Sequence, residues 1–400
     1  MKTKIKFCPD CGPLPVNHFH NWTSDLIHFV LESTVGKIVP ASLNYFLDQR
    51  LQRAMVWFGV LRPTKNMDPE KISLRTAVFL KEAEKAGIEC ENLLSRFGPT
   101  NYFRLKINNC FHYFEGLPRA EQRETRVSKI IDDKAEVKNI LQAEGLPAVN
   151  GRAFSWRQKK QAIRWASANL NFPLAVKPRF GSMSQHITMN IQDAPALKSA
   201  IDAAIRYSPF FIVENFLADA QTHRATVIDF NLAGCVKRVP AHVAGDGRHT
   251  IKELVEIKNQ DLRRGNPRAK DTTLYKLVLN ETAEQLLKSQ NLSWDAVLPK
   301  DKTAFLQEKV ILDLGGDLHE ESDRVHPDNQ ELFCRVARIF NTRLAGVDFL
   351  AKDIGVSWKA QPCAIMELNS LPYIDMHHFP AVGAPVNPAA AVCRLVKKYY

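Results

Sequence analysis

From Asp133 to Tyr400, short apolar runs alternate with stretches of helical period, and this alternation restricts the fold more than any other feature of the chain. Apolar runs rich in branched and aromatic residues predict strands, and apolar residues recurring every three or four positions predict helices. The expected strands are FPLAVKP, PFFIVENFL, RATVIDFNLAG, KVILDLGG, AGVDFLAKD and CAIMELN. The expected helices are the stretch capped by Asp133 and ended by Gly145, then QKKQAIRWASANL, APALKSAIDAAIRY, TIKELVEIKNQDL, ELFCRVARIF and the tail from Pro388. The pattern predicts an α/β fold.

The first 115 or so residues form a separate block. SLRTAVFLKEAEKAG predicts a helix with Leu74, Ala77 and Val78 on one face and Gly87 as its stop. ECENLL and NYFRLKINNCFHYF predict strands, with a turn at the pair Asn108-Asn109. We therefore expect a small α/β domain over residues 1–115 and a second, larger domain over residues 116–400.

The chain is basic, with 54 Lys and Arg against 43 Asp and Glu and a net charge of +11. This excess suits anionic partners, among which nucleotides and acidic amino acids qualify as well as nucleic acid. No aromatic and basic recognition motif supports a nucleic-acid partner. The segment 258–276 holds six basic residues against two acidic ones, and we expect it to be a surface loop.

The sequence does not indicate secretion, membrane insertion or a disulfide-rich fold. The start, MKTKIKFCPDCGPLP, lacks the apolar run of a signal peptide, and no apolar segment is long enough for a membrane span. The eight cysteines do not follow the spacing of a disulfide scaffold. We expect a cytoplasmic protein with mostly reduced thiols and no membrane partner.

Oxygen-bearing side chains recur near the C-terminus. In AIMELN, the period of two puts Glu367 and Asn369 on one face, and in AGVDFLA it separates Asp348 from its apolar neighbours. If the two strands pair, these three side chains gather in one place, which suits Mg²⁺. The alternative is that both strands are half-exposed and their polar side chains meet solvent.

Two lysines occupy positions that suit phosphate binding. Lys177 ends the strand LAVK and precedes a loop of small residues, where it could reach phosphate oxygens together with backbone amides. Lys134 opens a helix, where a positive charge is mildly unfavourable against the helix dipole. For either lysine alone, an ordinary solvated residue is the alternative.

Several familiar signatures are absent from the sequence: the Walker A motif, the Rossmann glycine fingerprint, H-E-x-x-H and G-x-S-x-G. Cys8 and Cys11, followed by His18 and His20, could bind zinc. Their spacing is not that of a standard zinc finger, and free thiols are the alternative.

From about Ser128 to about Ala390, the ordered motifs resemble the ATP-grasp superfamily, above all the ATP-grasp domain of cyanophycin synthetases and bifunctional glutathione synthetases. The motifs are DKAEVKNILQAEGLP, LAVKPRFGS, FIVENFL, HRATVI, KRVPAHVAGDGRHTIKELVEIKNQDLRRG, DRVHPDN, AGVDFL and MELNSLPYIDMHHFPAVG. The resemblance implies an ATP-grasp fold with a central lobe over about 125–212 and a C-terminal lobe over about 213–400, preceded by the small N-terminal domain.

The resemblance also implies roles for individual residues. Lys134 and Lys177 are similar to the two lysines that hold the ATP phosphates, and Glu214 stands at the hinge whose backbone meets adenine. Arg224 and Arg238 resemble the arginines that face phosphate or the acyl-phosphate intermediate. The expected magnesium ligands are Asp348, Glu367 and Asn369, and the expected phosphate loop includes Ser182 and Ser184.

The sequence departs from these relatives in three places. Ser184 and His186 replace glycines of the phosphate loop, and serine hydroxyls could take over contacts to the γ-phosphate. Tyr373 and Asp375 stand where cyanophycin synthetases commonly carry Gly and Arg, so the cyanophycin substrates do not carry over. The chain also lacks a Mur-ligase-like half, so we expect it to form one type of bond.

The resemblance implies an ATP- and Mg²⁺-dependent carboxylate–amine ligase, joining amino acids or peptides through an acyl phosphate and releasing ADP and phosphate. Its substrates would be ATP, a carboxylate and an amine. The alternative is a nucleotide-binding regulatory protein with little turnover, which the altered loop favours and the intact Asp348, Glu367 and Asn369 set opposes. The oligomeric state stays open, with a homo-oligomer as one alternative.

Overall fold

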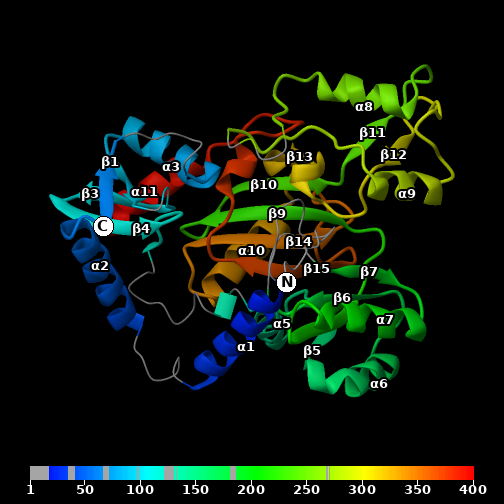
Figure 1. Cartoon of the computed structure of the whole chain (residues 1–400), viewed down its shortest axis with the longest axis horizontal. Helices are drawn as coiled ribbons and strands as arrows, with labels where there is room; N and C mark the ends of the chain where they lie inside the picture. Colours follow the sequence, from blue (N-terminus) through cyan, green and yellow to red (C-terminus); the bar gives the residue numbers. More distant parts are fainter. Residues whose placement is uncertain are drawn as a thin grey trace, which may run out of the picture.

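The computed structural model describes residues 18–34, 41–65, 72–96, 98, 100–120, 130–131, 133–180, 186–266, 269 and 271–400. Three antiparallel sheets of four or five strands, each with its own helices, make up most of the described chain. A smaller two-stranded sheet projects from the largest of them (Figure 1). Among the described residues, none of the helices combines the length and the apolar character that crossing a bilayer requires.

The N-terminal unit, which we define as α2, α3 and β1 to β4, is a four-stranded sheet covered by α3. Its elements are α2 (Ala41–Trp57), β1 (Leu61–Thr64), α3 (Leu74–Lys85), β2 (Glu89–Ser95), β3 (Tyr102–Ile107) and β4 (Cys110–Glu115). Ser73 caps α3, and Gly87 has a φ of +73°, which ends the helix as predicted. Asn108 and Asn109 both have positive φ angles in the β3–β4 turn.

The apolar face predicted for α3 is wrong, because the buried positions lie almost on the opposite side of the helix from the predicted ones. The fully buried side chains are those of Thr76, Phe79, Leu80 and Ala83, whereas Leu74, Ala77 and Val78 are only partly buried. The Thr76 hydroxyl donates to the Gly116 carbonyl at 2.9 Å, so a polar residue occupies the inner face. The face was misassigned because Thr76 interrupts the apolar pattern.

The core of the N-terminal unit continues into the C-terminal part of the chain. Phe79, Leu80 and Phe103 belong to the same apolar cluster as Ile374 and as Val392 of the last helix, α11 (Pro388–Tyr399). The Asn108 side chain donates to the Tyr400 carbonyl at 3.0 Å, and Lys397 donates to the Ala86 carbonyl at 2.7 Å. The division of the chain at residues 115 and 116 stays a prediction, but the two parts share one core.

The central sheet has the strand order β5-β8-β6-β7 and is packed against two helices. Its elements are β5 (Gly151–Ser155), α6 (Lys159–Asn169), β6 (Leu174–Pro178), β7 (Thr188–Ile191), α7 (Ala194–Ile205) and β8 (Phe210–Asn215). β6 and β8 are buried along almost their whole length, which explains why they read as continuous apolar runs. β5 and β7 are more polar, and the sequence did not reveal them.

The C-terminal sheet has the strand order β13-β10-β9-β14-β15. Its elements are α5 (Lys134–Ala143), β9 (Gln221–Ile228), β10 (Asn231–Val239), β13 (Asp317–Glu320), α10 (Pro327–Ile339), β14 (Leu344–Ala351) and β15 (Cys363–Asn369). Helices α5 and α10 pack on one face of this sheet through Val137, Leu141, Phe333 and Val336. Asp133 caps α5 by accepting from the backbone amides of residues 135 and 136, as predicted.

Two predictions for this part of the chain are wrong. KVILDLGG is not a strand, because Leu312–Leu314 forms a short 3-10 helix that ends at Gly315 with a φ of +96°. The run RATVIDFNLAG is not one strand but the β9–β10 hairpin, in which Asp229 and Phe230 both have positive φ angles. Apolar runs alone cannot place such a tight turn, because a partly buried turn keeps its apolar residues.

The projecting subdomain contains β11 (His242–Ala244), α8 (Ile251–Asn259), α9 (Glu281–Ser289) and β12 (Thr303–Phe305) (Figure 1). The expected surface loop at 258–276 is only partly a surface loop. Arg264 is 5% exposed, and its Nη2 donates to Asp317 of β13 at 2.5 Å. Lys258 donates to the same carboxylate at 2.7 Å, so two of the six basic residues anchor the subdomain to the sheet.

Helix α1 (His18–Thr34) lies against the central sheet and not against the N-terminal unit (Figure 1). Trp22 Nε1 donates to the Ile205 carbonyl at 3.2 Å, and the Ser208 hydroxyl donates to Asp25 at 2.8 Å. The Phe29 ring lies 4.4 Å from the Phe210 ring, centre to centre. Helix α2, in contrast, contacts β4, where Gln49 Nε2 donates to the Tyr113 carbonyl at 2.7 Å.

Candidate active site

The C-terminal sheet places three charged side chains in one row across neighbouring strands. Asp348 of β14 is paired in register with Glu367 of β15 on one side and with Arg224 of β9 on the other. Asn369 lies two positions beyond Glu367 and is opposite Gly346. The pairing expected of the two C-terminal strands is therefore present, and it brings the three predicted magnesium ligands to one end of the sheet.

Asp348 is the most enclosed member of this row, with 1% of its surface exposed. Arg224 donates to both of its oxygens, with 2.8 Å between Nη2 and Oδ2, and Arg238 Nη1 lies 3.6 Å from Oδ2. Burial alone would raise the pKa of Asp348, but the two guanidinium groups hold it well below its usual range. Asp348 is therefore a carboxylate at neutral pH.

Lys134, the first residue of α5, lies beside this row. Its Nζ is 3.4 Å from Glu367 Oε2, so α5 brings an ammonium group to the predicted magnesium ligands. This contact also explains why a lysine opens the helix despite the dipole. The attraction of the Glu367 carboxylate offsets the unfavourable position of the Lys134 charge at the N-terminus of α5.

The donor set at this end of the sheet fits a magnesium ion. Asp348, Glu367 and Asn369 supply carboxylate and amide oxygens, the ligands that Mg²⁺ prefers. Within the described ranges, Asn369 Nδ2 is buried without a hydrogen-bond partner, and this donor suits a phosphate oxygen, whereas a metal ion would take the amide oxygen. No group of three or more His, Cys, Asp or Glu side chains that could hold a metal ion occurs in the part of the chain that the structure describes.

Lys177 occupies a second cationic centre on the central sheet. Its Nζ lies 2.7 Å from Glu214 Oε1, and Lys138 of α5 donates to the other oxygen of the same carboxylate. All three side chains are at least nine-tenths buried. Burial alone would raise the pKa of Glu214, but the ammonium groups of Lys177 and Lys138 lower it to about 2.

Sequence reasoning missed Lys138, although a signal for it existed. Lys138 stands on the buried face of α5 beside Val137 and Leu141, where an unpaired lysine would be costly. A lysine among the apolar positions of an amphipathic helix indicates a buried carboxylate partner, which here is Glu214. The expected contact of Glu214 with adenine stays a prediction, and its side chain is engaged in this ion pair.

The predicted phosphate loop is only partly described. Ser182 and Ser184 lie outside the described residues, and so do Cys8 and Cys11 of the zinc prediction. Beyond the loop, the His186 ring stacks on Tyr207 with 3.5 Å between ring centres. Before it, Arg179 binds Asp133, the cap of α5, with 2.6 Å between Nη2 and Oδ2.

The segment after Asn369 folds back over the row. An ideal Cβ on Gly346 would lie 3.1 Å from both Arg224 Nη1 and Pro372 Cβ, so the segment and the arginine meet above this glycine. Arg75 of α3 donates to the Leu371 carbonyl at 2.5 Å, and its guanidinium carbon lies 4.9 Å from the Tyr373 ring centre. The N-terminal unit thus contributes Arg75, which sequence reasoning did not identify.

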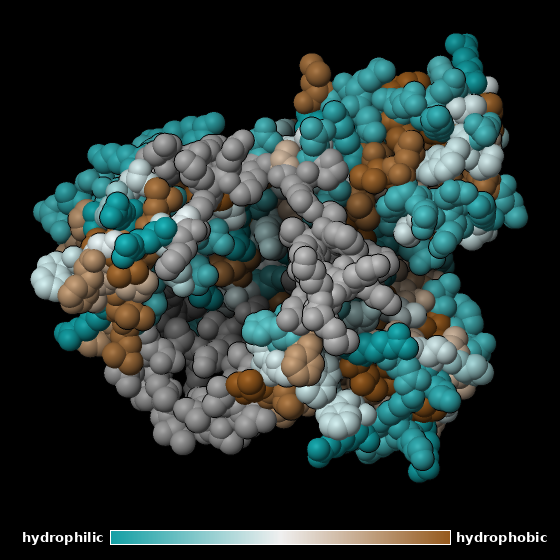
Figure 2. Space-filling view, in the orientation of Figure 1, coloured by the Kyte–Doolittle hydropathy of each residue, from teal (hydrophilic) through white to brown (hydrophobic). Residues whose placement is uncertain are grey.

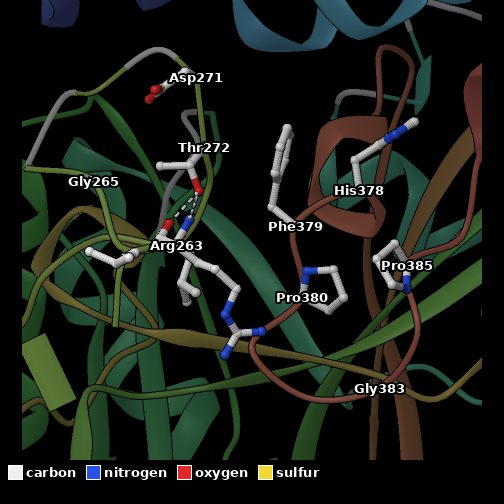
Figure 3. A pocket seen from close by; sticks show the side chains of 11 residues that line it. Arg263, Gly265, Asp271, Thr272, His378, Phe379, Pro380, Gly383 and Pro385 are labelled. Atoms are coloured by element: carbon white, nitrogen blue, oxygen red, sulfur yellow. Dashed lines mark hydrogen bonds between the residues drawn. The ribbon is translucent and has the colours of Figure 1, made fainter. Parts of the chain in front are cut away.

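A cavity of about 360 Å³ opens next to this segment, between residues 262–274 and residues 378–385 (Figure 3). Arg263 lies on one side of it and Phe379 and Pro380 lie on the other, and His378 forms part of its wall. The space-filling view shows the surface hollowed between the N-terminal unit and the two larger sheets (Figure 2). The site therefore has a neighbouring space in which a second substrate could be held.

The chain is similar to two kinds of biosynthetic protein. The cyanophycin synthetase of Trichormus variabilis is 32% identical over 325 residues, which cover 79% of this chain and 34% of that protein. The cyanophycin synthetase of Synechocystis sp. is 34% identical over 263 residues, which cover 65% of this chain and 29% of that protein. The glutathione biosynthesis bifunctional protein GshAB of Clostridium perfringens is 26% identical over 78% of this chain and 40% of its own length.

The chain belongs to the ATP-grasp family. A crystal structure of a bifunctional glutathione synthetase from Pasteurella multocida aligns with 83% of the chain and 44% of its own length, at a TM-score of 0.62 and 24% identity. This likeness confirms the α/β ATP-grasp fold that the sequence predicted. No protein-family model matches the chain.

This ATP-grasp protein spans about a third of the length of the cyanophycin synthetases that it matches. Most of each relative lies outside this likeness, so the activity of the whole relatives does not transfer with the family. The function has to be argued from the residues of this chain.

Proposed function

We propose that this chain is an ATP-dependent carboxylate–amine ligase, which joins amino acids or peptides through an acyl phosphate and releases ADP and phosphate. The observation that carries the proposal is the row of Arg224, Asp348 and Glu367 on an ATP-grasp sheet, with Lys134 beside it. Anion-binding and metal-binding side chains lie side by side in this row, as a phosphoryl transfer between two anions requires.

The reaction must first activate a poor acylating agent. A carboxylate has oxide as its leaving group, whereas an acyl phosphate has phosphate. Arg224 and Arg238 are placed to bind the oxygens of the carboxylate and of the transferring phosphoryl group, and Lys134 and Lys177 to bind the ATP phosphates. A magnesium ion held by Asp348, Glu367 and Asn369 would offset the charge of the phosphates.

Closure around the intermediate is the second requirement, because an acyl phosphate hydrolyses in water. Arg224, Asp348 and Lys177 are each at least nine-tenths buried even without substrate. Cys235 and Cys363 do not offer a covalent alternative, because burial raises the pKa of Cys235 far above its usual value and that of Cys363 to about 11. We therefore propose direct attack of the amine on the acyl phosphate.

The reaction is tested by trapping its intermediate. We expect ATP consumption to depend on one carboxylate among a panel of amino acids and small peptides, and to yield ADP. Hydroxylamine should intercept the acyl phosphate and give a hydroxamate when the amine is left out. The assay measures nucleotide products and hydroxamate together. AMP with pyrophosphate would indicate adenylation, and ADP formation independent of any carboxylate would leave an ATPase or a nucleotide sensor.

Lys177→Met tests the phosphate contact. We expect ATP to bind on the order of ten- to a hundredfold more weakly, because a hydrogen bond to a charged group contributes roughly 1.5–3 kcal/mol. Adenosine, which has no phosphate, should bind almost unchanged. Calorimetric titration of both ligands measures the difference.

The matched control is Lys159→Met, which removes a partly exposed lysine paired with Asp202 on the same sheet's helices. This variant should leave both affinities unchanged. Equal losses of ATP and adenosine binding in Lys177→Met would mean that Lys177 only supports the fold through Glu214.

A further inference from the structure

Asp375 is a buried carboxylate that the proposed roles above do not use. It belongs to a short 3-10 helix, Ile374–His377, which directly follows the segment over the row. Only 5% of its surface is exposed, and among the described residues Asp375 Oδ1 has no hydrogen-bond partner. A buried acceptor without a partner is costly, which points to a ligand that supplies a donor.

Two arginines from different parts of the chain act on this carboxylate. Arg75 comes from α3 of the N-terminal unit, and Arg224 comes from β9. Arg75 Nε and Arg224 Nη1 are themselves buried without a hydrogen-bond partner in the described part of the chain. Donors and an acceptor thus remain unsatisfied in the same region without binding one another, which is the arrangement expected where a substrate brings both an anionic and an amine group.

The segment that carries Asp375 is held in place by contacts with the N-terminal unit. Ile374 is fully buried in the cluster that also contains Phe79 and Leu80 of α3. Arg75 adds its hydrogen bond to the Leu371 carbonyl and its contact with the Tyr373 ring. These contacts fix the backbone that leads into Asp375, whose Oδ1 has no hydrogen-bond partner among the described residues.

The cavity of Figure 3 adjoins the segment that carries Asp375. His378 follows Asp375 by three residues, its backbone amide donates to the Asp375 carbonyl at 3.0 Å, and it lines the cavity of Figure 3. Within the described residues, His378 Nε2 is also buried without a partner. An amine substrate whose remainder occupies this cavity would present its nitrogen near Asp375.

We propose that Asp375 binds the attacking amine and accepts its proton, and that Arg75 is a positioning residue for this carboxylate. The inference rests on the proposed ligase function and assigns an amino-acid or peptide amine to the side of the site next to Asp375. The amine nitrogen bonds to the acyl carbon, the bond from that carbon to the phosphate oxygen breaks, and phosphate leaves with the electron pair. The proton of the amine passes to the Asp375 carboxylate and then to solvent.

The electrostatic surroundings suit this role. Burial raises the pKa of Asp375 to about 6, although Arg75 and Arg224 oppose the rise. Asp375 in turn acts on Tyr275, from the segment beside the cavity, whose pKa rises to about 12 mainly through burial. Asp375 is then largely ionised at neutral pH and a stronger base than an exposed aspartate, as proton transfer near pH 7 requires.

Asp375→Asn separates this role from the activation of the carboxylate. Hydroxylamine is largely unprotonated at neutral pH and does not need the base. With the activating carboxylate and ATP, we expect hydroxamate formation within about twofold of the unmodified protein. With the common amino acids and glycylglycine as amines, ligation should fall on the order of 10²–10⁴-fold, the range typical of general base catalysis. Asp229→Asn, in the distant β9–β10 turn, is the control and should leave both rates unchanged.

The outcomes are distinct. Equal loss of hydroxamate and amide with a lowered melting temperature, or no loss of either, would overturn the role of Asp375. Hydroxamate without any amide from the whole amine panel would overturn the assignment of an amino-acid amine. If the unmodified protein forms no hydroxamate with any carboxylate, the ligase function itself fails, and the inference fails with it.

A pH profile tests Arg75. The ligation rate of the unmodified protein should fall below about pH 6, as Asp375 becomes protonated. Arg75 favours the ionised form of Asp375, so Arg75→Met should raise the pKa of Asp375 and move this acidic limb of the pH profile to higher pH. Arg75→Lys keeps the positive charge and should largely restore the original profile. A limb that stays in place in Arg75→Met would mean that Arg75 is only structural.

Discussion

Glu367→Ala is expected to lose most magnesium-dependent turnover, on the order of 10²–10³-fold, the cost typical of removing one group that stabilises charge in a transition state. Its melting temperature should change little, because the side chain is 22% exposed and lies at the end of the sheet, outside the apolar core. ADP release across a magnesium titration, together with thermal unfolding, measures both effects.

The control for this variant is Glu331→Ala on α10. Glu331 is an exposed glutamate, 2.7 Å from Arg338 and remote from the row, so its loss should leave turnover unchanged. Unaltered turnover in Glu367→Ala would remove this residue from the predicted magnesium ligands. A large fall in melting temperature would instead indicate that Glu367 holds α5 in place through Lys134.

Glu214→Gln is expected to lower the free energy of unfolding by roughly 3–5 kcal/mol, because it leaves the buried ammonium groups of Lys177 and Lys138 without an anion. The pKa of Glu214 is lowered from 4.5 to about 2, so the ion pair stabilises the fold fully above about pH 4.5 and loses its effect as the pH falls toward 2. The difference between the two proteins should therefore shrink over this range. Urea unfolding at several pH values measures it.

Glu284→Gln gives the matched comparison, since Glu284 forms an exposed pair with Lys288 at 2.6 Å within α9. Exposed pairs of this spacing contribute about 0.3–0.5 kcal/mol, so this variant should be almost neutral. A pH-independent loss in Glu214→Gln would assign the effect to packing and not to charge.

Local patterns predicted much of the fold and part of the site. Period-two alternation placed Asp348 and Glu367 on polar faces, and the strand pairing then brought them together, because the two strands are neighbours in the sheet. The cap at Asp133 and the turn at Asn108 and Asn109 followed from side-chain and backbone preferences that act within a few residues. Such features are readable because their causes are local.

The remaining features depend on contacts between distant parts of the chain. Nothing near Arg75 indicates Leu371 or Tyr373, because 296 positions separate the two sides of the hydrogen bond. The sequence predicts a backbone contact between Glu214 and adenine. The buried ion pair of Glu214 with Lys138 could not be predicted, because the sequence does not show that α5 contacts the central sheet. An apolar face predicts that a helix is covered but does not identify what covers it, which is why the shared core of Phe79 and Ile374 was not foreseen.

The separate positions of α1 and α2 have a mechanical consequence. α1 is bound to the central sheet through Trp22 and Asp25, and α2 is bound to the N-terminal unit through Gln49. Any movement of the central sheet away from the C-terminal sheet carries α1 with it, whereas the shared core keeps α2 with the C-terminal sheet. The seven peptide units between Thr34 and Ala41 can span at most roughly 25 Å. The chain thus contains a covalent tether that sets an upper limit on how far the central and C-terminal sheets can separate while both helices stay bound.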